Sequence, residues 1–469
     1  MTNPILAKFR AMHAEIESLR AALEARSRAD DRGWMSQTAG GLPMERPCMA
    51  ASTPRPEFVA RYEVESSIPP ARVAEAIAGE QSSGTFVAVP GETEELARRS
   101  RARVLRVEEL GEAAAPTLHS ARTRPGDRFA RAAIDIAFPV ANVGHSLPNI
   151  LATVAGNLFE LGEVTGLRLV DIAMTPEHAA GFPGPAFGIP GTRRVAGVEG
   201  RPLVGTIIKP SIGLTAEETA RVVDGLCAGG IDFIKDDELV ADPPYEPFSN
   251  RLRAVMAVLH RHADRLGRMP VYAINVTGSG DEMRRRHDEV LAAGGTCVMA
   301  SLNWVGFGGM ADLRRHAQLP IHGHRNGWGA LTRHPALGFS FAAYQKLWRL
   351  AGIDHLHCNA PGSKFWEPDE SVMAAGRSCL GEFAGVAPLL PAFSSGQWAA
   401  HAPVLHAGLG SVDLLHLAGG GIIAHPDGIE AGVASMREAW EAAIAGIDLA
   451  AHARHRPALR RALAHFGKG

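Results

Sequence analysis

The chain has 469 residues, too many for one ordinary domain and enough for two, one of them large. Apolar residues make up 46% and charged residues 21% of the sequence, as in soluble globular proteins, and the formal net charge is −2. A balance this close to neutral offers no basic face to a polyanion, so nucleic acid is excluded as an expected partner.

The sequence also argues against membrane insertion and against a disulfide framework. No apolar stretch reaches the roughly 18 residues of a membrane span, and the first residues carry charge every few positions, unlike a signal peptide. The five cysteines are scattered, odd in number and without CxxC spacing. We therefore predict a cytoplasmic protein with no membrane partner.

Residues 1–56 are predicted to form a helical arm followed by a flexible linker. Apolar residues from Ile5 to Leu23 alternate steps of four and three, which is the seam of a coiled coil of about three heptads. From Ser27 to Pro56 the chain is rich in Gly, Ser, Pro and Arg, as linkers are. The helix either pairs with a partner chain or covers the protein's own surface, and the spacing fits both.

The next region, residues 57–182, mixes strand-like and helix-like segments and predicts a modest α+β domain. Strand-like alternation and helical periodicity identify the segments. The strands are expected at 58–66, 103–110 and 129–139, and the helices at 69–81 and 147–160.

A regular alternation of apolar runs and helical segments then predicts a (β/α)8 TIM barrel over residues 183–469. A doubly wound open sheet is the rival, but it often carries a Gly-rich fingerprint after its first strand, which is missing here. The eight runs span 205–210, 231–237, 271–278, 297–303, 320–326, 353–359, 386–396 and 413–421.

Polar and glycine residues gather where these runs end. The active site of a TIM barrel lies at the carboxyl ends of its strands, so these residues are predicted to converge on one rim. They are Lys209 after the first strand, Lys235, Asp237 and Glu238 after the second, His324 and Arg325 after the fifth, His357 after the sixth with Lys364 on the following loop, Ser394 and Gly396 after the seventh, and Gly419 and Gly420 after the eighth.

The run Lys-Asp-Asp-Glu at 235–238 predicts a magnesium site. Residues i and i+2 of a strand face the same side, so Lys235 and Asp237 both point into the barrel mouth, and Glu238 follows at the start of the loop. Carboxylates are hard oxygen ligands of the kind that Mg2+ prefers. A solvated acidic loop with a lysine counter-ion is the alternative.

The other rim residues predict a phosphate-bearing substrate. Imidazoles together with Arg325 can bind a phosphate and hydroxyl groups. Glycines at 419–421 let backbone N–H groups approach an anion, and TIM barrels often bind phosphate after strands 7 and 8. The loop NAPGSKFW places Lys364 where a lid can close over a substrate.

These motifs resemble those of ribulose-bisphosphate carboxylase/oxygenase (RuBisCO) and the RuBisCO-like proteins, over about residues 57 to 460. The shared pattern is GTIIKP, GGIDFIKDDE, HxHR, DHLH with a lysine-bearing loop, SSG and GGG, in that order. The resemblance implies a ferredoxin-like α+β domain before the barrel. It also implies a homodimer or higher homo-oligomer, in which the barrel of one subunit and the N-terminal domain of the other share each active site.

The resemblance further assigns a role to each matching position. Lys235, carbamylated by CO2, would bind Mg2+ together with Asp237 and Glu238, and Lys209 would be the acid/base lysine. Lys364 would contact a carboxylate or CO2. Substrate and phosphate contacts would come from His324, Arg325, His357, Ser394, Gly396, Gly419 and Gly420, and from Glu80, Thr85, Phe86 and Asn157 of the N-terminal domain.

Three departures from the carboxylases bear on the reaction. Ser211 stands where they have a second lysine, Trp328 where they have a histidine, and the lid reads KFWE. The lid is similar to that of RuBisCO-like proteins that decarboxylate or hydrolyse 3-oxo-isoapionate 4-phosphate.

The resulting hypothesis is a Mg-dependent carboxy-lyase that forms a metal-bound enediolate from a phosphorylated sugar acid. Three alternatives stay open. They are an enolase or isomerase of methionine salvage acting on a phosphorylated diketo sugar, a ribulose-bisphosphate carboxylase, and a non-catalytic regulatory protein.

Overall fold

The structure is a computed structural model that describes residues 55–84, 89–120 and 122–467. The predicted helical arm lies outside the described residues, as do Thr85 and Phe86. The described part contains an antiparallel sheet domain and a closed parallel barrel, so the predicted fold class is confirmed. The exact borders at 56/57 and 182/183 stay predictions.

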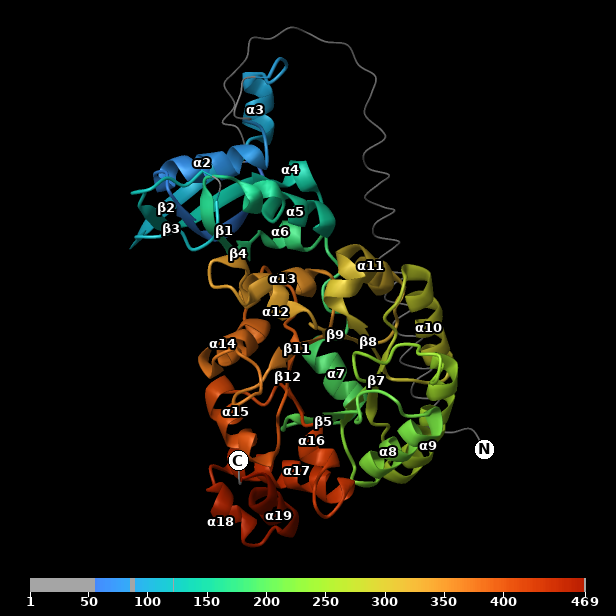
Figure 1. The fold of residues 1–469 in the computed structure, drawn as a ribbon. Helices are drawn as coiled ribbons and strands as arrows, with labels where there is room; N and C mark the ends of the chain where they lie inside the picture. Colours follow the sequence, from blue (N-terminus) through green and yellow to red (C-terminus); the bar gives the residue numbers. More distant parts are fainter. Residues whose placement is uncertain (1–54, 85–88, 121, 468–469) are drawn as a thin grey trace, which may run out of the picture. The chain divides into compact units, whose positions relative to one another are not determined.

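The N-terminal domain is built on four antiparallel strands in the order β4-β1-β3-β2, with a helix after β1 and another after β3 (Figure 1). This βαββαβ succession is the ferredoxin-like arrangement. The elements are β1 (Glu57–Ser66), α2 (Pro70–Glu80), α3 (Glu94–Ser100), β2 (Arg103–Ala113), β3 (Phe129–Pro139), α4 (Val140–Val143), α5 (Leu147–Val154), the 3-10 turn η1 (Asn157–Glu160), β4 (Val164–Ala173) and α6 (Pro176–Ala179).

The predicted helix over 147–160 is shorter in the structure. Helix α5 ends at Val154, and a separate 3-10 turn follows at Asn157. Between them Gly156 approaches the backbone so closely that a Cβ atom there would lie 2.2 Å from the carbonyl oxygen of Ala152. The glycine therefore marks a change of direction that the apolar periodicity alone did not reveal.

Eight parallel strands close into the barrel in the order β5-β6-β7-β8-β9-β11-β12-β13. Seven of them lie inside their predicted runs, whereas β5 begins two residues before the run predicted at 205–210. Helices follow the strands along the chain, as in other TIM barrels (Figure 1). The strands are β5 (Leu203–Ile207), β6 (Phe233–Lys235), β7 (Val271–Asn275), β8 (Cys297–Ser301), β9 (Ile321–His324), β11 (His355–Asn359), β12 (Leu390–Ser394) and β13 (Leu415–Leu417).

The barrel helices include the long α9 and α17 and several short pieces at the loops. They are α7 (Gly188–Ala196), α8 (Ala216–Ala228), α9 (Phe248–Leu266), α10 (Gly280–Ala292), α11 (Leu302–His316), α12 (Trp328–Thr332), α13 (Phe341–Leu350), α14 (Asp369–Leu380), the 3-10 turn η2 (Ala399–His401), α15 (Ala402–Leu409), α16 (Gly420–Ile423), α17 (Ile429–Ala445), α18 (Leu449–Ala453) and α19 (Pro457–Phe466). No helix in the described part of the chain is long and apolar enough to span a membrane.

The barrel interior is a packed core rather than a channel. Phe233 on β6 and Leu417 on β13 are fully buried, together with inward-facing residues of β7, β8 and β12. Because Phe233 and Lys235 lie two residues apart on β6, the side chain of Lys235 stands directly above this apolar floor. The strand ends are therefore supported from below by close packing.

A short strand, β10 (Leu337–Phe339), joins the barrel to the N-terminal domain. It leaves the loop after β9 and pairs in parallel with β4, as the fifth strand of that sheet. The Arg168 guanidinium of β4 adds hydrogen bonds to Thr332 and to the carbonyl of His334. A three-residue strand has too little alternation to be found in the sequence, and it was not predicted.

Asp232, at the amino end of β6, binds three arginines from other segments. Its fully buried carboxylate accepts hydrogen bonds from Arg201 at 2.5 Å, Arg268 at 2.9 Å and Arg437 at 3.2 Å. Burial acts to raise the pKa of Asp232, but the paired Arg201 and its neighbours hold that pKa below its ordinary value. The buried carboxylate thus gives three partly buried arginines a shared counter-charge at the end of the barrel opposite the predicted site.

We predict that Asp232→Ala destabilises the protein by about 2–3 kcal/mol, because it leaves three partly buried arginines close together without their shared counter-charge. The stabilisation from a carboxylate of lowered pKa is present above the ordinary aspartate pKa and is lost as the pH falls through the folded-state value. Urea unfolding at pH 7 would measure the loss. Asp281→Ala is the control, since Asp281 pairs with Arg284 on an exposed surface, and an equal loss there would contradict the prediction.

Candidate functional site

Two lysines and two carboxylates meet at the ends of β5 and β6. The ammonium group of Lys209 donates to Asp237 Oδ2 at 2.7 Å and to Ser211 Oγ at 2.7 Å. Lys235 is fully buried, and its Nζ lies 3.5 Å from Glu238 Oε2. Burial lowers the pKa of Lys235, and the carboxylates of Glu238 and Asp237 only partly oppose it. A lowered pKa raises the fraction of free amine available to react at neutral pH.

The intervening Asp236 points the other way. Its carboxylate accepts hydrogen bonds from Arg251 at 3.2 Å, from the backbone N–H of Asn275 at 2.9 Å and from the hydroxyl of Tyr272. Strand alternation therefore divides the acidic run, as expected, into Lys235 and Asp237 on one side and a structural aspartate on the other.

Asn275, at the end of β7, supports the same loop from the side. Its Nδ2 group donates to the carbonyls of Asp237 at 3.3 Å and Glu238 at 3.2 Å, while its Oδ1 accepts from Thr277 at 2.6 Å. Asn275 thereby orients the backbone that carries both carboxylates. It was not singled out from the sequence, although its place at the carboxyl end of a barrel strand was a usable signal.

Neutral imidazoles line the β9 and β11 side of the cluster. His324 Nδ1 accepts the N–H of Asn326 at 3.3 Å, so Nε2 carries the proton and faces Glu238 Oε2 at 3.4 Å. The rings of His324 and His357 lie 4.4 Å apart. Burial lowers the pKa of both rings well below the ordinary value, and the nearby Lys235 acts in the same direction.

A second pair of histidines lies deeper in the barrel. His322 and His355 have ring centroids 5.7 Å apart, and both are fully buried beside Phe233. His355 Nε2 is 2.7 Å from Thr192 Oγ1, which itself donates to a backbone carbonyl. This pair therefore lies beneath His324 and His357, where it contacts the apolar floor of the barrel.

Glycines form a cradle between the ends of β12 and β13. Gly396 has a φ of +66° and lies beside the lid residues Ser363 and Lys364, and Gly419 lies beside the side chain of Lys209. A Cβ atom on Gly420 would meet nothing within 4 Å, whereas one on Gly421 would lie 2.3 Å from the carbonyl of Gln397. Gly420 thus borders open space, and Gly421 permits a close backbone contact.

Two serines precede the cradle. Ser394, the last residue of β12, is buried, whereas Ser395 has a φ of +86°, which is rare for a residue with a side chain. Its hydroxyl is buried, and no hydrogen-bond partner for it lies among the residues that the structure describes. Strained residues of this kind cluster at ligand sites, so Ser395, which the sequence placed in the SSG motif without a role of its own, is a further candidate.

The lid loop joins β11 to α14 and has an exposed tip and an anchored stem. Lys364 and the aromatic residues Phe365 and Trp366 are exposed. Glu367 is 8% exposed, and its carboxylate binds Asn359 Nδ2 at 2.7 Å and lies 3.6 Å from the guanidinium of Arg325. Glu367 was missed because a single glutamate after a lysine-bearing loop gives no sequence signal.

The structure does not bring every predicted residue to this cluster. Glu80, at the end of α2, and Asn157, in η1, are exposed on the N-terminal domain, and their side chains make no hydrogen bond in the described part of the chain. Trp328 is buried against Tyr344, with ring centroids 4.4 Å apart. The roles of all these residues stay predictions.

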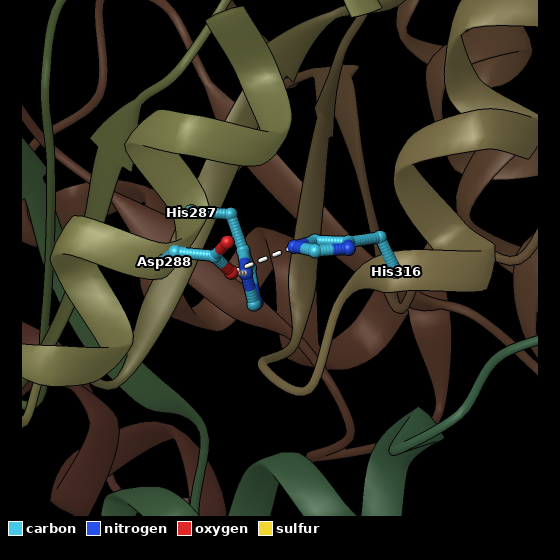
Figure 2. A group of neighbouring side chains, drawn as sticks. All are labelled: His287, Asp288 and His316. Atoms are coloured by element: carbon cyan, nitrogen blue, oxygen red, sulfur yellow. Dashed lines mark hydrogen bonds and ion pairs between the residues drawn. The ribbon is translucent and has the colours of Figure 1, made fainter. Parts of the chain in front are cut away.

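A second group of possible metal ligands lies elsewhere, between α10 and α11 (Figure 2). His316 Nε2 lies 2.6 Å from Asp288 Oδ1, and His287 Nδ1 lies 3.1 Å from the same oxygen. However, His287 Nε2 accepts the backbone N–H of Gln318 at 3.0 Å, so Nδ1 carries the proton and has no lone pair for an ion. The trio is therefore a hydrogen-bonded cluster that does not fit a metal.

Two family models match the chain. The N-terminal domain of the ribulose bisphosphate carboxylase large chain matches residues 52–178, and the catalytic domain of the same large chain matches residues 188–466. The chain belongs to the RuBisCO large-chain family. This confirms the resemblance inferred from the barrel motifs.

Several relatives within the family have specific names. A 3-oxo-isoapionate-4-phosphate transcarboxylase/hydrolase of Xanthobacter autotrophicus is 55% identical over 86% of this chain and 98% of its own length. A 3-oxo-isoapionate-4-phosphate decarboxylase of Rhizobium etli is 43% identical over 87% of this chain and 98% of its own length.

Solved structures agree with this placement. A rubisco-like protein from Burkholderia fungorum has a TM-score of 0.82 and 48% identity, covering 87% of this chain and 99% of its own. A dimeric archaeal Rubisco from Hyperthermus butylicus has a TM-score of 0.78 and 31% identity, covering 88% of this chain and 96% of its own.

Replacing the neighbouring glycines Gly420 and Gly421 by alanine is predicted to have different effects on the melting temperature. Gly420→Ala should keep or slightly raise the melting temperature, because there is room for the methyl group and alanine favours a helical position, but it should weaken phosphate binding. Gly421→Ala should lower the melting temperature, because its Cβ atom would collide with Gln397. Thermal melts with and without inorganic phosphate would test both predictions. If the two variants had the same melting temperature and the same response to phosphate, the different roles given to Gly420 and Gly421 would be contradicted.

Proposed function

We propose that this protein is a Mg-dependent carboxy-lyase that converts a phosphorylated β-keto sugar acid, such as 3-oxo-isoapionate 4-phosphate, into CO2 and an enediolate. The observation that carries the proposal is the group of Lys235, Asp237, Glu238 and Lys209 at the barrel mouth, in a chain whose relatives act on that compound by name. A cytoplasmic location accords with this role in sugar catabolism.

The chemistry of the donor set fits a magnesium ion. Asp237 and Glu238 supply carboxylate oxygens, and the lowered pKa of Lys235 favours the free amine that reacts with CO2. Carbamylation would convert this amine into a carbamate anion with release of a proton, and the carbamate would supply a third oxygen ligand. When bound, Mg2+ would stabilise negative charge on the keto and hydroxyl oxygens of the substrate.

The chain's own residues supply binding and proton transfer. Gly396, Gly419 and Gly420 would hold the phosphate with backbone N–H groups, and Lys364 would hold the departing carboxylate. As the bond to the carboxylate carbon breaks, its electron pair enters the enediolate and CO2 leaves. Lys209 then donates a proton to the carbon left behind and regains one from water, with Asp237 at 2.7 Å keeping its ammonium group in place.

A transcarboxylase/hydrolase reaction is the second candidate, and the 55% identity to the Xanthobacter protein favours it specifically. The first step would be the same loss of CO2. The CO2 would then add to the other enediolate carbon, and water would cleave the new β-keto acid into two acids. The two candidates therefore differ only in what happens to the CO2 after the shared step.

The remaining alternatives have less support. A methionine-salvage enolase leaves Lys364 without a carboxylate to bind, and a carboxylase would be expected to carry a second lysine where Ser211 stands. A non-catalytic role leaves the Lys235 cluster without a function. Homo-oligomer formation is proposed as well, since Glu80 and Asn157 lie on the N-terminal domain, from which a second copy could complete the site.

Removing one acidic ligand should weaken magnesium binding without unfolding the protein. In bicarbonate buffer, Asp237→Asn should weaken Mg2+ binding at least about tenfold, measured by calorimetry, because it removes a charged oxygen ligand. Asp236→Asn is the matched control, because its side chain faces Arg251 and Tyr272. It should lower the melting temperature and leave Mg2+ affinity nearly unchanged, and the reverse pattern would refute the metal site.

The reaction itself can be followed with substrate labelled with 13C at the carboxylate. A decarboxylase releases one labelled CO2 per substrate, whereas a transcarboxylase/hydrolase retains the label in one of two acid products. Lys209→Ala should reduce kcat about 10²–10⁴-fold in either case, because it removes the general acid. Lys346→Ala is the control lysine, since Lys346 pairs with Asp171 instead. An unreacted substrate would refute both candidates.

A further inference from the structure

The guanidinium of Arg325 already has a negative partner inside the protein. Arg325 is 6% exposed, lies 5.8 Å from the ring of Phe341, and has its Nη2 3.6 Å from Glu367 Oε2. Burying an arginine is costly unless its charge is paired, and this carboxylate provides the pairing. The charge of Arg325 is therefore neutralised within the folded chain.

Glu367 is held in place by further contacts, so the pairing is part of the fold. Its Oε2 accepts from Asn359 Nδ2 at 2.7 Å, and its Oε1 accepts from Ser371 Oγ at 2.9 Å. Asn359 ends β11 and Ser371 lies in the first turn of α14, so both stems of the lid contribute. With both oxygens bonded and 8% exposure, the carboxylate is fixed and mostly desolvated.

A phosphate dianion beside Arg325 would meet this carboxylate. It would have to displace Glu367 from three partners or accept a like charge close by in a medium of low dielectric constant, and both are unfavourable. The glycine cradle presents no such obstacle, because Gly420 borders open space and Gly419 lies beside the ammonium-bearing side chain of Lys209. An anion at the barrel mouth should therefore bind more favourably at the glycine cradle than beside Arg325.

We propose that Glu367 is a specificity residue that closes the Arg325 side of the mouth to phosphate. The site then accepts a sugar acid with one phosphate group, bound at the Gly396–Gly419–Gly420 cradle, and gains nothing from a second phosphate. This inference rests on the proposed function. It adds that the substrate carries one phosphate group and that Glu367 determines this preference.

Binding to the native protein gives a first test that requires no mutation. Calorimetry with Mg2+ and bicarbonate would compare a pentitol monophosphate with the pentitol 1,5-bisphosphate of the same length. The two should bind within about threefold of each other, since the charge of Arg325 is already paired with Glu367. A bisphosphate that binds more tightly than that, or the failure of both ligands to bind, would overturn the proposal.

The second test removes the charge and keeps the shape. Glu367→Gln can still bond to Asn359 and Ser371 but leaves Arg325 unpaired, so the bisphosphate should bind at least about tenfold more tightly than to the native protein. Ser371→Ala, which removes one hydrogen bond and leaves the charge, should show no gain. A folded Glu367→Gln variant without a gain, or an equal gain in Ser371→Ala, would also overturn the proposal.

These measurements are independent of turnover. If the labelled keto acid does not react but the binding ratios are as expected, the proposed reaction is wrong and the monophosphate selectivity of the mouth stands. If the keto acid reacts and the bisphosphate binds far more tightly to the native protein, the reaction stands and the role of Glu367 is wrong.

Discussion

The placement of a lysine amine out of contact with water is the constraint on which the site depends. Lys235 is fully buried above an apolar floor, and its Nζ has the carbonyl of Asp236 at 2.7 Å and the carboxylate of Glu238 at 3.5 Å. A buried ammonium group is unfavourable, so the environment holds the pKa of Lys235 below its ordinary value. The neutral histidines around it follow from the same burial, because further positive charge there would be equally unfavourable.

The barrel sets this arrangement through strand alternation and side support. On β6 the side chains point in turn to the core, outward and to the mouth, which separates Asp236 from Lys235 and Asp237. Asp236 accepts hydrogen bonds from Arg251 and Tyr272. Asn275, which lies on β7, donates a hydrogen bond to the backbone of the acidic loop that follows β6. Lys235 and Asp237 therefore lie at or just after the rigid end of β6. Asp236 and Asn275, whose side chains do not point into the barrel mouth, hold that end in place.

Much of this was predictable from sequence, for identifiable reasons. Eight apolar runs are a strong repeating signal, and the rule that polar residues at strand ends converge brought Lys209, Lys235, Asp237, Glu238, His324 and His357 to one rim. Features that depend on tertiary contacts were missed. The strand β10 exists only because β4 is beside it, α5 ends where a glycine approaches a carbonyl, and Glu367 acquires its role from an arginine 42 positions earlier in the chain.

The lid and the glycine cradle are joined by a shared residue. Gln397, next to Gly396, donates from Nε2 to the carbonyl of Pro361 at 3.0 Å and to that of Ser395 at 3.0 Å. One stem of the lid is therefore tied to the cradle, while Glu367 ties the other stem to Arg325. The tip with Lys364 is exposed between these two anchors, so the proposed closure of the lid would need to move a few residues rather than the whole loop. In the proposed reaction, a phosphate that orders the cradle would act on the same backbone that carries Lys364. Binding of the phosphate would then be linked to the exclusion of water above the enediolate.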